Sequence, residues 1–376
     1  MNSLETLSTP AAIVDVARLD RNIARMQQRL DSLGVKFRPH VKTTKCVEIV
    51  RRQAAAGAQG ITVSTLKEAE QFFAAGFADI LYAVGIVPNK FGQALALRQR
   101  GCDLKLITDN VDMARALGRF GAEHGHRFEL WIEVDTDGHR SGIAPGSPLL
   151  LDVGRAIEEG GSVLGGVMTH AGSSYDCDTP QALLEIAEQE RAGCVRAAQR
   201  LREQGLACPV VSVGSTPTAL SARTLEGVTE VRAGVYVFFD LVMANVGVCT
   251  PQDIALSVLT TVIGHQPDKG WAIVDAGWMA MSRDRGTQKQ KHDYGYGQVC
   301  GLDGEVVPGY VLGGANQEHG VLSREGEPDP DIVRRFPVGT QLRILPNHAC
   351  ATAAQFPQYE AVDAGGLHEW PRFYGW

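Results

Sequence analysis

The chain has 376 residues, of which 44% are hydrophobic and 21% are charged, and its formal net charge is −7. This composition is typical of a globular protein with room for two domains. The acidic balance, with an isoelectric point of about 5.8, argues against nucleic acid or an anionic membrane as a partner, because both require a basic surface.

The first ten residues lack the apolar core of a signal peptide, and no apolar run reaches the length of a transmembrane helix. The 8 cysteines are scattered, which we interpret as reduced and mostly buried thiols. We therefore expect a cytoplasmic protein.

Short apolar runs alternate with helical patterns over the first two thirds of the chain. We expect strands at 11–16, 60–63, 80–84, 104–107, 128–134, 164–169 and 210–213. We expect helices at 20–33, 46–56, 66–75, 91–100, 111–124, 147–159 and 180–204. This alternation predicts a parallel sheet, and the number of repeats favours a closed barrel over an open doubly wound sheet. No Gly-x-Gly-x-x-Gly motif follows the first strand, which counts against a dinucleotide-binding open sheet.

The pattern changes at about Pro251. Short strands are expected at 254–263, 271–274, 306–312 and 341–345, separated by Gly, Pro and Asp turns, and helical patterns disappear. This predicts a mostly antiparallel β-domain, which the N-terminal strand joins. We therefore place a barrel at 18–248, inserted between the β-domain segments 1–17 and 249–376.

The run Arg-Pro-His-Val-Lys at 38–42 lies between a short apolar stretch and a helical pattern. This order places Lys42 at the carboxyl end of a strand, where α/β barrels carry their chemistry. Strand alternation would put His40 and Lys42 on the same side. A lone lysine is ordinarily a solvated cation, but one that loses solvent becomes a nucleophile for a carbonyl cofactor.

Three further runs combine polar residues with the ends of expected strands. The small residues at 212–218 and 230–236 follow late strands, where backbone N–H groups can approach a phosphate, although such runs are also common turns. His170 ends a strand on the same face, with Tyr175 nearby, and a lone histidine is more often structural. The polar run 133–142 is ordinarily a solvated loop held by Asp and Gly turn chemistry.

His348 and Cys350 are two residues apart, so on a strand both side chains would face one way. Imidazole nitrogen and thiolate sulfur are ligands that Zn²⁺ prefers. Two ligands are too few for a structural zinc site, but they suit a catalytic ion with open positions.

These runs, in this order and over essentially the whole chain, resemble the D-serine dehydratase and D-threonine aldolase family. The resemblance implies an alanine-racemase-like architecture, a (β/α)8 barrel plus a mainly antiparallel β-domain. It also implies a homodimer in which the β-domain of one chain covers the barrel mouth of the other. Lys42 would carry pyridoxal 5'-phosphate (PLP) covalently.

By the same resemblance, the phosphate of PLP would meet Thr216, Gly234 and Val235, and His170 and Tyr175 would also contact the cofactor. Arg140 would face the pyridine nitrogen of PLP and leave it unprotonated, because an arginine does not give up its proton. The PLP ring would then be a weaker electron sink, and a metal could compensate by assisting the reaction. Ser64 would contact PLP where some aldolases have glutamine, which puts the expected hydrogen bond in doubt.

The resemblance assigns the divalent metal to His348 and Cys350. Zn²⁺ suits these ligands best, while Mn²⁺, Co²⁺ or Ni²⁺ could serve in an open site. A His-x-Cys pair is typical of the dehydratase branch, and His-x-Asp is typical of the aldolase branch. A Glu-His-Gly run at 318–320 also matches the family, without an assigned role.

The implied activity is a PLP- and metal-dependent dehydratase of 3-hydroxy-D-amino acids. D-threo-3-hydroxyaspartate or D-serine would yield a 2-oxo acid and ammonia, with Lys42 as the base and the metal on the β-hydroxyl. A metal-dependent D-threonine aldolase is the alternative. A non-catalytic PLP carrier is a second alternative, but such a protein has no β-domain. A racemase would need a second base, which we do not identify in the sequence.

Overall fold

The computed structural model describes residues 4–376, and the chain divides into two compact units. The barrel unit comprises Arg25–Gly234 and Phe373–Trp376, and the β unit comprises the chain up to Ala24 and Val235–Arg372. Helix α1 (Val16–Ser32) begins in the β unit and continues into the barrel unit.

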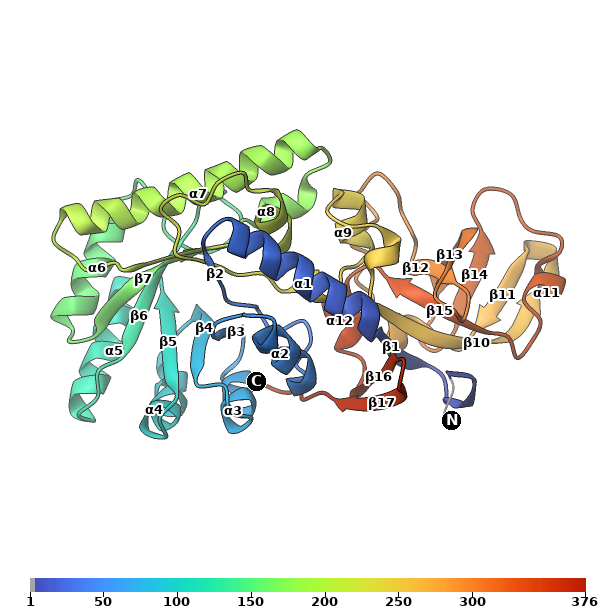
Figure 1. Cartoon of the computed structure of the whole chain (residues 1–376), viewed down its shortest axis with the longest axis horizontal. Helices are drawn as coiled ribbons and strands as arrows, with labels where there is room; N and C mark the ends of the chain where they lie inside the picture. Colours follow the sequence, from blue (N-terminus) through green and yellow to red (C-terminus); the bar gives the residue numbers. More distant parts are fainter. Residues whose placement is uncertain (1–3) are drawn as a thin grey trace. The chain divides into compact units, whose positions relative to one another are not determined.

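The barrel unit contains an eight-stranded parallel sheet in the order β2-β9-β8-β7-β6-β5-β4-β3. Strands β2 to β7 of this sheet are labelled in Figure 1. An isolated parallel bridge between His40 and Thr62 joins the chain beyond β2 to β3, which confirms the predicted (β/α)8 barrel. The strands are β2 (Lys36–Phe37), β3 (Ile61–Val63), β4 (Asp79–Gly85), β5 (Asp103–Thr108), β6 (Glu129–Val134), β7 (Val163–Thr169), β8 (Val210–Val213) and β9 (Glu230–Val231). The helices are α2 (Val47–Ala55), α3 (Leu66–Ala74), α4 (Phe91–Gln99), α5 (Val111–Glu123), α6 (Leu149–Glu159), α7 (Pro180–Glu203) and α8 (Thr216–Ser221).

Local sequence explains where several helices begin. The side chains of Thr65, Asn110 and Thr179 accept hydrogen bonds from backbone N–H groups in the first turns of α3, α5 and α7. Such caps satisfy donors that have no partner within the helix. Pro180 follows Thr179 at the first position of α7, where the missing N–H costs no hydrogen bond.

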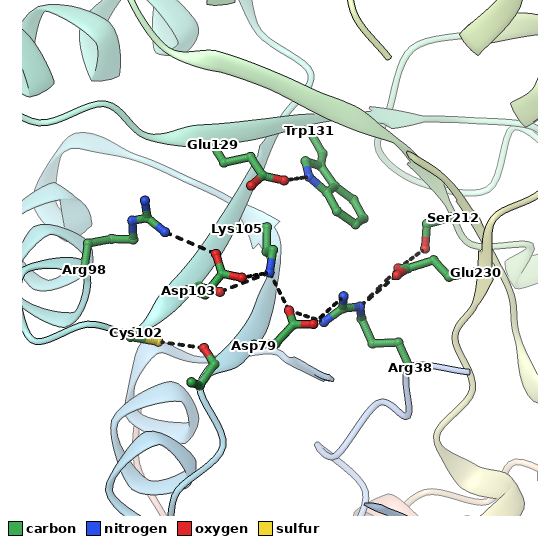
Figure 2. Close-up of polar contacts among 11 residues, drawn as sticks. Arg38, Asp79, Arg98, Cys102, Asp103, Lys105, Glu129, Trp131, Ser212 and Glu230 are labelled. Carbon is green, nitrogen blue, oxygen red and sulfur yellow. Dashed lines mark hydrogen bonds and ion pairs between the residues drawn. The ribbon is translucent and has the colours of Figure 1, made fainter. Parts of the chain in front are cut away.

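Side chains fill the inside of the barrel. Leu81, Ile107, Trp131 and Met168 form a buried apolar cluster. A chain of ion pairs lies at the starts of the strands, where Arg38 bonds both Asp79 (2.8 Å) and Glu230 (3.0 Å) and Lys105 bonds Asp79 (Figure 2). Asp79 and Glu230 are the first residues of β4 and β9, so this network occupies the end of the barrel opposite the strands' carboxyl ends. That end of an α/β barrel contributes stability rather than chemistry.

The β unit contains a nine-stranded, mainly antiparallel sheet in the order β11-β14-β13-β12-β15-β10-β1-β16-β17, with β10 also paired to β11. This confirms the predicted antiparallel β-domain. The strands are β1 (Ala11–Asp15), β10 (Leu256–Gln266), β11 (Trp271–Val274), β12 (Gly297–Cys300), β13 (Val306–Ala315), β14 (Gly320–Arg324), β15 (Gln341–Pro346), β16 (Gln358–Asp363) and β17 (Gly366–Pro371). The expected loss of helices after Pro251 is wrong, because α10 (Trp278–Met281), α11 (Ile332–Arg335) and α12 (Ala349–Ala353) interrupt the strands.

The chain passes from one unit to the other after Ala24 and again after Gly234, and not at the predicted bounds of 18 and 248. The segment that contains α9 (Leu241–Val246) belongs to the β unit, where the amide of Asn22 bonds the carbonyl of Val237 and Ala255 N–H bonds the carbonyl of Phe238. The last four residues belong to the barrel unit, because Phe373 donates to the carbonyl of Lys45.

Two other features of the described residues bear on the sequence predictions. None of the cysteines forms a disulfide, and all except Cys177 and Cys350 are buried. Within residues 4–376, no helix combines the length and the apolar composition needed to span a bilayer.

Candidate active site

The carboxyl ends of the barrel strands carry the predicted cofactor residues. Ser64 follows β3 directly, His170 follows β7 directly, and Thr216 begins α8 after β8. Lys42, Arg140 and Gly234 lie in the segments after β2, β6 and β9, and Val235 begins a 3₁₀ turn (Val235–Val237). Because parallel strands end at one rim of a barrel, the fold gathers the residues from the barrel unit at one end of it.

The segment that carries Lys42 differs from the expectation. It is a turn and not a strand, with Lys45 N–H bonded to the carbonyl of Val41 at 2.9 Å, so the argument from strand alternation does not apply. The side chain of Lys42 is exposed. The expected loss of solvent around this amine is therefore not observed, and its accessibility leaves it free to react with an incoming carbonyl group.

Two histidines beside this turn are held in the neutral form. Burial lowers the pKa of His170 to about 3, Lys42 and Arg140 act in the same direction, and a hydrogen bond to the Gly214 carbonyl opposes them. Burial, followed by the charge of Lys42, lowers the pKa of His40 well below its ordinary value. Lys42, Arg140 and both histidines therefore share one electrostatic neighbourhood, in which the rings bind through hydrogen bonds without carrying charge.

Arg140 lies in a loop that Asp and Gly turns stabilise, as is usual for a polar run such as 133–142. Asp135 accepts hydrogen bonds from the N–H groups of Asp137 and Gly138 at 3.2 and 2.8 Å. The side chain of Arg140 is 52% exposed, and its guanidinium lies 3.8 Å from the carboxylate of Glu133. Its predicted role beside a pyridine nitrogen stays a prediction. Tyr175 lies in the turn Gly172–Asp176, with its ring centroid 6.0 Å from that of His170.

The segments after β8 and β9 pack so closely that they require glycine. Gly214 has a φ of +136°, and a Cβ there would lie 2.0 Å from the carbonyl oxygen of Arg232. A Cβ on Gly234 would lie 2.9 Å from the carbonyl oxygen of His40. Small residues here keep side chains away from the backbone next to Thr216, which suits a phosphate held by backbone N–H groups.

Two shielded polar atoms near the Lys42 turn test whether a polar cofactor fits. His40 Nδ1 and Thr62 Oγ1 are both hidden from solvent and have no hydrogen-bond partner among residues 4–376. A buried polar atom without a partner costs about 1–3 kcal/mol. A polar cofactor that bonds these atoms would remove that cost, so the residues present fit a group such as PLP.

Ser64 is already engaged. Its hydroxyl donates to Glu68 at 3.0 Å, its N–H donates to the other oxygen of the same carboxylate, and Lys45 lies 3.2 Å from it. A contact between Ser64 and a cofactor would compete with these bonds, in keeping with the doubt that the sequence raised.

The predicted metal pair lies in the β unit, but not on a strand. Strand β15 ends at Pro346, His348 precedes α12, and Cys350 lies in its first turn. The argument from strand alternation is therefore wrong, although the pair still comes together, because the two side chains are hydrogen-bonded to each other. A helical turn achieves this contact by curving the chain back on itself.

The surroundings of His348 favour a cation. Its Nδ1 lies 2.5 Å from a carboxylate oxygen of Asp284. Burial acts to lower the pKa of His348, but Cys350, Asp284 and Asp240 outweigh it and raise that pKa to about 11. A divalent ion can take the place of this proton, since metal ligands bind in their deprotonated forms. The donor set thus fits a metal.

Asp240 fixes the turn that carries this pair. Its buried carboxylate accepts from Met243 N–H and from Ala349 N–H, both at 2.9 Å, so it caps α9 and α12 together. Asn347 adds a second anchor by donating to the Gly295 carbonyl at 2.7 Å. The described residues contain no cluster of three or more His, Cys, Asp or Glu suited to a metal. Any ion here therefore keeps positions open for other ligands.

Sequence reasoning missed Asp284 and Asp240, which lie far along the chain from His348. An acidic residue before an apolar helical run was the only available signal, and it marks Asp240 as a helix cap. The Glu318–His319 run forms the turn between β13 and β14, where the Asn316 N–H donates to the His319 carbonyl at 2.8 Å.

Known proteins resemble the chain over its whole length. Two family models match it, "Alanine racemase, N-terminal domain" at residues 14–242 and "Putative serine dehydratase domain" at residues 255–362. D-threo-3-hydroxyaspartate dehydratase of Delftia sp. (strain HT23) is 68% identical over 100% of both chains. D-serine dehydratase of Dictyostelium discoideum is 30% identical over 96% of this chain and 95% of that protein.

Solved structures also resemble the chain over its whole length. The D-threo-3-hydroxyaspartate dehydratase from Delftia sp. HT23 superposes with a TM-score of 0.99 at 67% identity, with 100% of each chain covered. Two variants of that dehydratase, with alanine in place of a histidine and of a cysteine two positions later, have the same TM-score, and the cysteine variant is in the metal-free form. The chain therefore belongs to the alanine-racemase-like family that joins an alanine racemase N-terminal domain to a serine dehydratase domain, together with the D-threo-3-hydroxyaspartate and D-serine dehydratases.

Proposed function

We propose that this protein is a PLP- and metal-dependent dehydratase that converts D-threo-3-hydroxyaspartate to oxaloacetate and ammonia, with D-serine as a second substrate. The observation that carries the proposal is the His348–Cys350 pair, in a chain that is 68% identical to a D-threo-3-hydroxyaspartate dehydratase. The pair supports a metal that assists departure of a hydroxyl group, and the identity supports the choice of substrate.

Lys42 would hold PLP, with His170, Tyr175, Thr216, Gly234 and Val235 around it and with Arg140 and Ser64 as further predicted contacts. PLP, when bound, stabilises negative charge at the α-carbon of the substrate. When it is not bound to the cofactor, the amine of Lys42 would take the α-proton from one side only, which would select one enantiomer. The neutral rings of His40 and His170 donate or accept hydrogen bonds without adding positive charge.

His348 and Cys350 would hold the metal, for which we propose Zn²⁺. The metal, when bound, acts as a Lewis acid on the β-hydroxyl that leaves. Asp284 accepts from Nδ1 of His348 and so leaves the other ring nitrogen as the ligand, an arrangement common among metal-binding histidines. The alanine variants of the relative support this pair, because they concern a histidine and a cysteine at the same spacing.

Product analysis tests the proposal. The purified protein is incubated with PLP and with D-threo-3-hydroxyaspartate, D-serine or D-threonine, before and after treatment with EDTA. We expect ammonia with oxaloacetate or pyruvate, loss of activity on chelation, and recovery on addition of Zn²⁺. The better of the first two substrates is expected to be D-threo-3-hydroxyaspartate.

The alternatives give other results. Glycine and an aldehyde from D-threonine, with no 2-oxo acid, would establish the aldolase. A protein that binds PLP and forms no product from any of the three would be a carrier, although the 255–362 match to a serine dehydratase domain counts against this. The homodimer expected from the family stays a prediction that light scattering can test.

A further inference from the structure

Helix α7 carries one carboxylate that is almost completely buried. Glu190 is 2% exposed, whereas Glu188, two residues earlier, lies at the surface and pairs with Arg191. An ionised side chain is costly to bury unless several hydrogen bonds stabilise it. The sequence pattern of α7 gave no reason to separate Glu190 from its neighbours, so its contacts define its role.

One oxygen of Glu190 joins two loops. Oε1 accepts a hydrogen bond from Ala171 N–H at 3.0 Å and another from Gly214 N–H at 2.9 Å. The carboxylate also bonds the hydroxyl of Thr218. Ala171 follows His170 after β7, and Gly214 and Thr218 flank Thr216 after β8.

The hydrogen bonds of Glu190 lie just beyond the point where the pairing between strands β7 and β8 ends. The last registered pair between β7 and β8 is Met168 with Ser212. Beyond it, the loops contain the predicted cofactor residues and have no strand ladder to fix their separation. Glu190 continues the connection, together with the bond between His170 Nδ1 and the Gly214 carbonyl at 3.1 Å.

We infer that Glu190 is a positioning residue that sets the spacing between the His170 loop and the Thr216 turn and so preorganises the PLP site. The inference rests on the proposed function, because it takes PLP as the ligand. Preorganisation of loops matters for affinity, since a loop that must be ordered on binding lowers the net binding free energy.

The test compares two variants with a matched control. Glu190→Met removes the acceptor oxygens at nearly constant length, Glu190→Gln keeps one acceptor oxygen, and Glu188→Met makes the apolar change on the exposed face of the same helix. The dissociation constant of PLP is measured by titrating each cofactor-free protein and following visible absorbance. Thermal unfolding of each cofactor-free protein is recorded beside it.

We expect Glu190→Met to weaken PLP binding about tenfold or more, as the loss of a hydrogen bond to a charged group predicts. Glu190→Gln should restore most of the affinity, and Glu188→Met should bind as the wild type does. A Glu190→Met protein that unfolds at a lower temperature but binds PLP normally would show a purely structural role and overturn the inference. Equal losses in the Gln and Met variants would show that charge matters rather than spacing, and would also overturn it.

A second measurement needs no variant. Amide hydrogen exchange of segments 168–175 and 212–218 is followed in the wild-type protein without and with PLP. We expect strong protection without PLP and little further gain with it, and free exchange that only PLP suppresses would overturn the inference. If the wild type binds no PLP at all, the proposed function itself fails, and that result is distinct from each outcome above.

Discussion

The same side chain, histidine, meets opposite surroundings in the two units. In the barrel unit, burial and the nearby charge of Lys42 lower the pKa values of His40 and His170. In the β unit, Cys350 and Asp284 overcome burial and raise the pKa of His348 to about 11. The first surroundings suit a neutral ring that bonds a cofactor, and the second suit a cation. Charge placement therefore distinguishes the predicted cofactor role from the predicted metal role.

Lys42→Ala removes the amine that would form the covalent link to PLP. We expect the variant purified with PLP to lose the visible absorbance band of the covalently bound cofactor. Lys36→Ala, which removes an exposed lysine of β2, serves as the control and should keep the band. A band that persists in the Lys42 variant would contradict the assignment.

Asp284→Asn weakens the acceptor that orients His348. We expect metal affinity to fall about 10–100-fold, as for other residues that hold a ligating histidine. Calorimetric titration with Zn²⁺ measures the affinity, and the Co²⁺ spectrum reports ligand geometry. Asp293→Asn is the control, because Asp293 lies in the same segment and pairs with Arg285 at 2.7 Å. Equal affinities for the Asp284 variant and the wild type would refute this role.

At the scale of elements, periodicity predicted the long strands and helices of the barrel well. Elements with too few residues to show a period were missed, such as β9 with two residues and α12 with five. The site residues were likewise predictable only where a local sequence pattern marks them. Motifs that end predicted strands, such as His170, were placed on the correct rim, while Asp284 is adjacent to His348 only through long-range folding.

The carboxylate of Asp240, which caps both α9 and α12, can be tested at the scale of elements. Asp240→Asn replaces one of two acceptor oxygens by an NH₂ group that faces a backbone N–H. We expect a loss of about 1–3 kcal/mol in the free energy of unfolding, together with weaker metal binding. Asp253→Asn, whose side chain caps an exposed turn in the same unit, should cost less. Chemical denaturation of all three proteins measures the difference, and equal losses in the two variants would argue against the shared cap.

At the scale of the whole molecule, the partly buried, neutral His170 makes stability depend on pH. Its folded pKa of about 3 lies below the ordinary value of 6.5, so between these values the unfolded chain binds a proton that the folded chain does not. The contribution is therefore fully present above pH 6.5 and is lost as the pH falls, by up to about 2 kcal/mol at pH 5.

Thermal unfolding between pH 7.5 and pH 5 measures this effect. The unfolding temperature of the wild type should fall more steeply on acidification than that of His170→Asn. His368→Asn, which changes an exposed histidine of β17, should follow the wild type. Parallel curves for the wild type and the His170 variant would mean that another group sets the acid limit.

The N-terminal strand has a consequence for synthesis on the ribosome. Strand β1 pairs on one edge with β10, with Ala11 opposite Leu259, and on the other edge with β16, with Ile13 opposite Glu360. Strand β1 is therefore translated long before β16, and until β16 is made one edge of β1 has no partner strand. During that interval the nascent chain exposes the unpaired backbone N–H and C=O groups of that edge, which could pair with another chain.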